Sequence, residues 1–143
     1  MRRASALLKN GKILIQGYSE TTSGVWIARG PVYVASVEQL DRLGQNIFDA
    51  LHQSSQGVPH PGPTEWKAIQ APMLEAAGAK TWAALAKSSK AVGLECQDEV
   101  VTITPSSNYE NDGGEELSDR AIRFNLKTAD IGERLIEAFN SCG

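Results

Sequence analysis

The chain has 143 residues, of which 41% are hydrophobic and 22% are charged, and its formal net charge is −3 at pH 7. These values are typical of a globular protein, and we expect a single domain over residues 1–143 with enough core to fold without disulfides or metal. No apolar run reaches the roughly 18 residues that a membrane helix requires, and the N-terminal segment lacks the apolar stretch of a signal peptide. The two cysteines, Cys96 and Cys142, show no metal-ligand spacing. We therefore expect a reduced, cytoplasmic chain without a membrane segment.

The chain is predicted to open with strands. Asn10-Gly11 lies between two apolar runs, which indicates a two-strand hairpin with a type I′ turn. Residues 24–28 and 32–35 predict two further strands, separated by Arg29-Gly30-Pro31, because a proline cannot donate to a central ladder. The opening segment is therefore predicted to be a meander of up to four strands.

An amphipathic helix is predicted next. Ser36 and Gln39 have the spacing of a capping box, and apolar residues then recur every three or four positions up to about Ser54. Residues 54–64 contain three prolines and two glycines, so this segment is predicted to be a loop.

Two more helices are predicted before the chain returns to strands. Thr64 is expected to cap a helix that ends at Gly78, with a kink or a break at Pro72. Thr81 is expected to cap a short third helix. Trp66 and Trp82 lie on these helices and are interpreted as core residues.

The second half predicts a hairpin, a loop, a strand and a final helix. Residues 91–96 and 100–104 form the expected hairpin, which Pro105 closes. Residues 106–118 are predicted to be an exposed, mobile loop, 121–126 a strand, and Thr128 the cap of the last helix. The order ββββ-ααα-βββ-α favours an α+β fold with a largely antiparallel sheet packed against helices.

The negative charge is concentrated in one segment. Eight acidic residues and no Lys or Arg occur between Glu95 and Asp119, so the rest of the chain is mildly basic. Such a segment can steer a cationic partner such as a basic nuclease, or it can be a solvated connector that keeps the protein soluble.

No pattern of catalytic residues is found. The two histidines, His52 and His60, have no neighbouring ligand or acid-base set, and the chain has no Gly-x-Ser-x-Gly motif and no phosphate-binding glycine loop. No catalytic, metal or cofactor residue is assigned. Trp26 and Tyr33, with Arg29 and Lys12, weakly resemble a nucleic-acid-binding strand surface, but packing of Trp26 in the core is favoured.

Several motifs occur in an order that resembles one group of contact-dependent growth inhibition (CDI) immunity proteins, of the CdiI type. They are Gly57-Val58-Pro59-His60-Pro61 leading to Trp66, then residues 76–82, Lys90-Ala91-Val92 and Thr102-Ile103-Thr104-Pro105. The resemblance implies an intracellular, non-enzymatic protein that neutralises the C-terminal toxin domain of a large exported surface protein, often a nuclease. It also implies that a toxin β-hairpin enters a pocket and extends the sheet of the immunity protein.

The contact residues are not implied by the resemblance and are chosen on physical grounds. Acidic and aromatic side chains on the charged loop, and aromatic side chains on the opening strands, are the candidates for partner binding. They are Tyr109, Glu110, Asp112, Glu115, Glu116, Tyr18, Trp26 and Tyr33. We expect a monomer or weak dimer that binds no nucleic acid directly; a single-stranded nucleic-acid-binding domain and a small enzyme with an unrecognised site are the alternatives.

Overall fold

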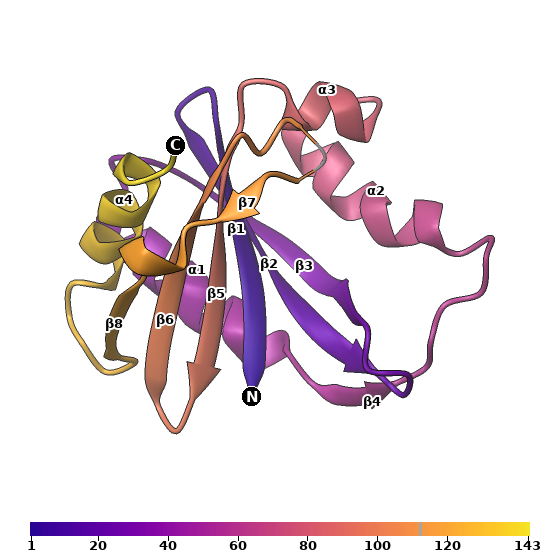
Figure 1. Ribbon diagram of the computed structural model, residues 1–143, viewed down its shortest axis with the longest axis horizontal. Coiled ribbons are helices and arrows are strands. Elements are labelled where there is room, and N and C mark those ends of the chain that lie inside the picture. Colours follow the sequence, from indigo (N-terminus) through magenta and orange to yellow (C-terminus); the bar gives the residue numbers. More distant parts are fainter. Residues whose placement is uncertain (112) are drawn as a thin grey trace.

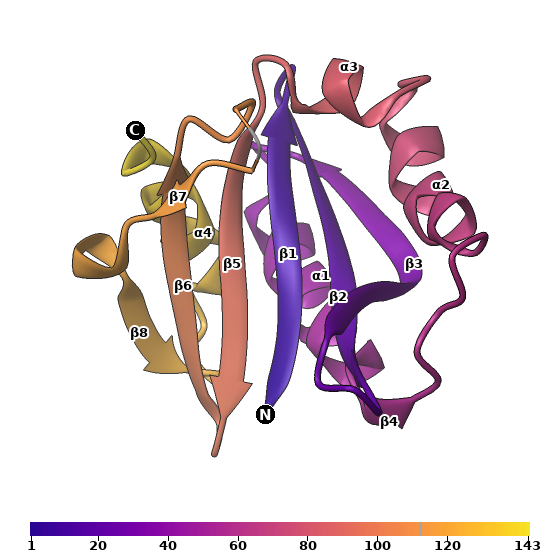
Figure 2. The same ribbon diagram turned by 45° about the vertical axis from the view of Figure 1, so that its right-hand side comes forward.

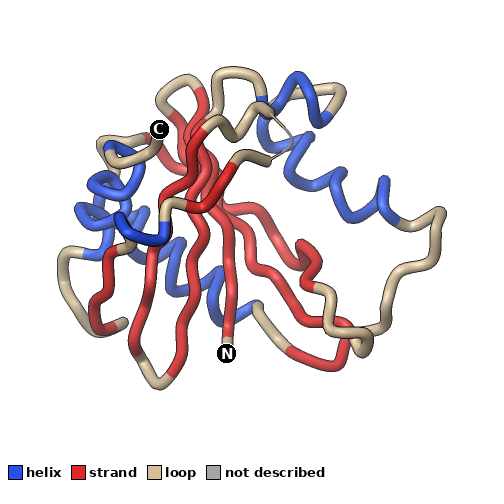
Figure 3. Tube along the Cα trace, viewed as in Figure 1, coloured by secondary structure: helices blue, strands red, loops and turns tan. Residues whose placement is uncertain are grey.

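The computed structural model describes residues 1–111 and 113–143 and shows one eight-stranded sheet with helices on both sides (Figures 1 and 3). The strands are β1 (Arg2–Lys9), β2 (Lys12–Thr21), β3 (Trp26–Ser36), β4 (Gln56–Val58), β5 (Lys90–Gln97), β6 (Val100–Ser107), β7 (Glu115–Glu116) and β8 (Ile122–Asn125). The helices are α1 (Leu40–Gln53), α2 (Trp66–Ala77), α3 (Trp82–Ala86) and α4 (Ile131–Asn140), with a 3₁₀ turn at Ser118–Arg120.

The sheet has the order β3-β2-β1-β5-β6-β7, with β4 beside β2 and β8 beside β6. Every pairing is antiparallel except that of β4 with β2. The first strand, β1, therefore lies in the middle of the sheet, where Arg3 is opposite Tyr18 on one side and Glu95 on the other. The expected α+β class with a largely antiparallel sheet is confirmed.

The two faces of the sheet are covered unequally. Helices α1 and α4 pack on one face and bury the main core, to which Ile47 of α1 and Leu135 of α4 contribute fully buried side chains. On the other face, α2 and α3 cover a smaller cluster of Leu7, Leu14, Met73, Leu85 and Ala91. Figure 2 shows α1 and α4 behind the sheet and α2 and α3 beside β3, with no described helix over the front of β1 and β5.

Several local signals predicted the structure correctly. Asn10 and Gly11 have φ values of 52° and 76°, as a type I′ turn requires, and β1 and β2 form the expected hairpin. Gly78 ends α2 in the left-handed conformation, with φ 69°. The side chain of Thr81 accepts a hydrogen bond from the backbone N–H of Ala84, as expected of the cap of α3.

The first long strand and the first helix differ from the prediction. Residues 26–36 form one strand instead of two, because Arg29-Gly30-Pro31 makes a bulge opposite Gly17 and pairing resumes at Val32. Helix α1 begins only at Leu40. Half of the predicted capping box is present, since Gln39 Oε1 accepts from the Ser36 N–H at 2.9 Å.

The remaining differences from the prediction lie in segments whose structure depends on contacts with residues far away in the sequence. The proline-rich loop contains β4, and α2 continues through Pro72 without a break. Strand β6 runs past Pro105 to Ser107, where it pairs with β7 inside the predicted loop. The N-cap of α4 is Asp130, so Thr128 does not cap this helix.

Candidate functional site

The candidate site is the part of the sheet that faces away from α1 and α4, between α2 on one side and β7 on the other. We call it the open face (Figure 2). Neighbouring residues in an antiparallel sheet share a face, so the register places Arg3, Tyr18 and Glu95 side by side across β2, β1 and β5. Trp26, at the start of β3, joins them because Arg3 contacts its ring.

Arg3 is held by two partners on the open face. Its guanidinium lies 4.7 Å from the centre of the Trp26 ring and its Nη2 lies 3.3 Å from Glu95 Oε1. The side chains of both charged residues are more than a third exposed, so the ion pair adds little to stability. The ion pair holds the Arg3 guanidinium over the Trp26 ring, and this contact fixes the position of the indole on the sheet.

A depression of about 320 Å³ lies on this face, and we call it the sheet groove. Gly93 contributes to its floor: a Cβ built on this residue would meet nothing within 4 Å, so the strand backbone is bare there. Glu116 of β7 stands at the far side. The groove is lined by Arg3, Ala4, Ser5, Tyr18, Trp26, Gly93, Leu94, Glu95, Thr104 and Glu116.

A second hollow, of about 150 Å³, lies between α2 and the sheet and shares Tyr18 and Trp26 with the sheet groove. We call it the tryptophan pocket because three tryptophans line it. Its residues are Gln16, Tyr18, Trp26, Ile27, Ala28, Trp66, Ile69, Gln70, Met73 and Trp82. The amide of buried Gln16 donates to the Gly30 carbonyl at 2.9 Å, so its NH₂ group is satisfied within the sheet.

Tyr109 connects the acidic loop to this end of the site. Its side chain packs against the cluster that includes Met73 and Trp82. Burial raises the pKa of Tyr109 to about 12; the nearby Tyr18 contributes to the rise, and a hydrogen bond from Trp82 opposes it. Burial also raises the pKa of Tyr18. The loop is thus anchored by a neutral phenol instead of standing free in solvent.

The free energy of unfolding is expected to fall between about pH 10 and pH 12, because the Tyr109 phenol ionises in the unfolded chain before it does so in the folded one. The stabilisation that comes from burying the neutral Tyr109 phenol is fully present below pH 10. Tyr109→Phe should make this decrease smaller, but should leave a remainder because the Tyr18 pKa is raised as well. Urea unfolding of both proteins at about pH 8 and about pH 11 measures the difference. An equal decrease in the two proteins would show that Tyr109 is not buried as described.

The acidic residues of the charged segment do not form one patch. Asp98 and Glu99 form the turn between β5 and β6, where Glu99 pairs with Lys127 at 3.4 Å. Glu110 accepts from the Ser88 N–H at 2.8 Å. Glu115 and Glu116 are exposed on β7, and Glu116 lines the sheet groove, as Glu95 does from β5; of the described acidic candidates for partner binding, Glu110 and Glu115 do not line it. Asp112 lies outside the described residues.

Three aromatic residues lie in surroundings that differ from those expected. Tyr33 packs against the main core on the α1 side of the sheet, on the face opposite to Tyr18 and Trp26, so it does not line the open face. Trp26 was favoured as a core residue but lies partly exposed on the open face, and Trp66 is 40% exposed. Only Trp82 packs against a buried cluster as predicted. Sequence reasoning missed Arg3, Glu95 and Gly93, because alternation along a strand assigns each residue to a face and only the pairing of β1 with β5 brings these residues together.

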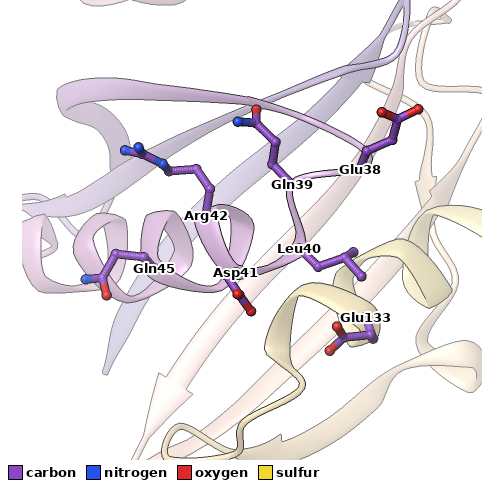
Figure 4. A pocket seen from close by; sticks show the side chains of 7 residues that line it. All are labelled: Glu38, Gln39, Leu40, Asp41, Arg42, Gln45 and Glu133. Atoms are coloured by element: carbon purple, nitrogen blue, oxygen red, sulfur yellow. The ribbon is translucent and has the colours of Figure 1, made fainter.

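Another depression, of about 660 Å³, lies where α1 begins, close to Glu133 of α4 (Figure 4). Glu38, Asp41 and Arg42 line it, and Figure 4 shows their side chains pointing in different directions instead of meeting at one point. This depression offers no set of groups directed at one ligand.

The other predicted groups have local structural partners. His60 Nδ1 lies 2.7 Å from Ser23 Oγ, and His52 Nδ1 lies 2.9 Å from the Phe48 carbonyl oxygen. Both cysteines are free. Within residues 1–111 and 113–143, no three His, Cys, Asp or Glu side chains are grouped so that they could hold a metal ion. None of the described helices is both long and apolar enough to span a membrane.

The fold and the open face define an α+β domain whose sheet is covered by α1 and α4 on one face and only in part, by α2 and α3, on the other, where the two hollows lie. This chain belongs to the CDI immunity protein family, because the family model for CdiI, described as CDI immunity protein, matches residues 2–142. No curated protein matched the sequence.

Two solved structures share the fold. One is a protein of unknown function from Neisseria meningitidis, with a TM-score of 0.81 and 20% identity over 99% of this chain and 95% of that one. The other is a chain of the CdiA-CT/CdiI toxin and immunity complex from Yersinia pseudotuberculosis, with a TM-score of 0.79 and 18% identity over 99% and 97%. The similarity at these identities establishes the common fold.

Proposed function

We propose that this immunity protein binds the C-terminal toxin domain of its own CDI system through the open face and thereby neutralises it, and that the toxin is a nuclease acting in the cytoplasm. The sheet groove carries the proposal: it is preformed, it is lined by aromatic and charged side chains, and no described helix covers it. Partly exposed aromatic side chains such as Trp26, beside charged ones, are typical of an interaction surface.

The charge of the site supports a cationic partner. The groove is lined by one positive and two negative side chains, and Arg3 is already paired with Glu95. Glu115, exposed next to Glu116 on β7, adds negative charge beside the groove. A nuclease must bind phosphates and therefore carries a basic surface, which complementary acidic residues attract and cover.

The open face suits a large partner better than the edge of β3 does. Pro31 has no N–H, and Gly30 has a φ of 93° within the bulge, so the outer ladder of β3 is interrupted. A toxin strand or hairpin could still pair with a short edge such as β8 while the groove receives its side chains. Backbone pairing would then add affinity, and the groove would supply selectivity.

A single-stranded nucleic acid is the second candidate, since the Arg3 guanidinium stacked on Trp26 resembles a base-stacking platform. The two carboxylates that line the same groove oppose it, because they would repel a phosphate backbone. The binding experiment therefore includes an oligonucleotide.

Purified chain should be titrated with the toxin domain encoded immediately upstream, and in parallel with a single-stranded oligonucleotide. We expect a toxin complex with a Kd in the nanomolar range, equivalent to about 12 kcal/mol, and an association rate that falls as salt increases. A folded chain that does not bind the toxin domain would contradict the proposed function. Salt-dependent binding of the oligonucleotide would favour the single-stranded nucleic-acid-binding function.

A further inference from the structure

The tryptophan pocket and the sheet groove are separated by a wall that both share. Trp26 and Tyr18 line both hollows, and the Arg3 guanidinium lies over the Trp26 ring at 4.7 Å. Arg3 is in turn paired with Glu95. The indole is therefore supported on the groove side, which helps to keep the pocket on its other side open.

Several of the side chains that line the pocket have structural partners of their own. Met73 is the single buried residue of α2, so this helix closes the pocket with little packing of its own. Trp82 is held by its contact with the Met73 cluster, and Gln16 by its bond to Gly30. Trp66 remains 40% exposed at the rim. The pocket is thus formed by side chains that have partners elsewhere, with its rim at Trp66.

The size and lining of the pocket define which side chain of a partner it can bind. An apolar cavity of about 150 Å³ is large enough to hold one benzene ring, and the tryptophan pocket has about that volume, with mostly apolar walls. It therefore fits one aromatic or branched aliphatic side chain. Burying such a side chain among tryptophans is how interface hot spots gain affinity.

The adjoining groove adds a charge preference. Glu95 is paired with Arg3, whereas no ion pair is formed by Glu116 within the described residues. Glu116 lines the groove from β7, across from Trp26 on β3. A cationic side chain entering the groove would gain this carboxylate as its partner.

We infer that the toxin segment recognised here carries an aromatic or branched aliphatic side chain that fills the tryptophan pocket, next to a lysine or arginine that pairs with Glu116. This inference rests on the proposed function and specifies the chemistry of the partner. The apolar side chain provides most of the affinity, and the cation sets the orientation of the segment.

Filling the pocket tests the apolar part. Ala28→Phe fills it from β3, and Gln70→Phe fills it from α2, so one variant remains informative if the other fails to fold. Each should keep the thermal unfolding midpoint and weaken binding of the upstream toxin domain by about thirtyfold or more, the size of a hot-spot substitution. Val34→Phe is the matched control, because Val34 is 43% exposed on β3 and lines neither hollow; its affinity should not change.

Glu116→Gln tests the charged part. It should weaken binding by about tenfold and make the association rate less dependent on salt, whereas Glu133→Gln on the helix-covered side should do neither. If the wild-type chain does not bind the toxin, the proposed function fails and this inference fails with it. If the wild type binds and both folded pocket variants bind equally well, the inference is wrong and the proposed function stands. If Glu116→Gln binds as tightly as the wild type and with the same salt dependence, the toxin segment does not carry a cationic side chain that pairs with Glu116.

Discussion

A chain carrying Trp26→Ala is expected to fold normally and to lose its protection against the toxin. Trp26 is partly exposed, belongs to neither buried cluster and forms the wall between the two hollows. Removing it merges the hollows and leaves Arg3 without its stacking partner. We expect affinity for the toxin domain to fall by about 2–4 kcal/mol, the range of interface hot spots, while the free energy of unfolding changes by about 1 kcal/mol.

The comparison needs affinity and stability to be measured on the same preparations. Calorimetric titration gives the affinity, and urea unfolding gives the stability. Phe48→Ala is a suitable control, because Phe48 is an aromatic residue of α1 that is 39% exposed on the other side of the sheet. Its loss should leave toxin binding unchanged. A Trp26→Ala chain that unfolds, or one that stays folded and binds as tightly as the wild type, would contradict the position assigned to this side chain.

The largest loss of stability is expected for Gly132→Val. Gly132 is buried in the first turn of α4, where a Cβ would overlap the carbonyl oxygen of Leu40 and lie 2.8 Å from its carbonyl carbon. These are backbone atoms, so α1 and α4 would have to separate over the main core. Overpacking of this kind costs about 1–3 kcal/mol or more, and a β-branched residue in a helix recovers little of it.

Gly93→Val is the matched control for that substitution. Gly93 lies in the middle of β5, and a Cβ there meets nothing within 4 Å. Because valine favours strands, this variant should be as stable as the wild type or slightly more so. Urea unfolding curves of the three proteins make the comparison. Equal stability of Gly132→Val and wild type would show that the two helices do not approach as closely as described.

Local turn and cap signals predicted much of the fold. The positive φ at Asn10 and Gly11, the left-handed Gly78 and the Thr81 cap depend on a few neighbouring residues, so the sequence contains their cause. The failures have a different origin. Strand β7 exists because Glu115 and Glu116 meet Ser107 and Ser106, and β4 exists because it lies beside β2. Such pairings depend on the whole sheet.

The site was predictable in part. Trp26 and Tyr33 are seven positions apart, so they lie on opposite faces once residues 26–36 form one continuous strand, but the predicted break at Arg29-Gly30-Pro31 hid that relation. The bulge at Arg29-Gly30-Pro31 did not alter that parity, and the structure places Tyr33 on the core side. What no local pattern could supply was the neighbourhood of Arg3, because the contact of Arg3 with Glu95 and Trp26 requires the central position of β1.

The acidic segment also shows that closeness in the sequence does not predict closeness in the structure. Its composition suggested one charged surface, but Glu99 lies in the turn between β5 and β6, whereas Glu116 lies on β7 and lines the sheet groove. Figure 1 shows β7 crossing the sheet well away from the end where β5 and β6 are joined. Sequence proximity therefore overstated the size of the patch. The charge available to a partner is that of Glu116 and its exposed neighbours on β7, which is why the predicted salt dependence is assigned to this end of the segment.

Growth of cells that express the upstream toxin domain together with this chain tests the central claim most directly. We expect that the wild type and Phe48→Ala restore growth, and that folded Trp26→Ala, present at the same level, does not. Failure of the wild type to restore growth would contradict the immunity function for that toxin, and equal protection by Trp26→Ala would show that the open face is not where the toxin is neutralised.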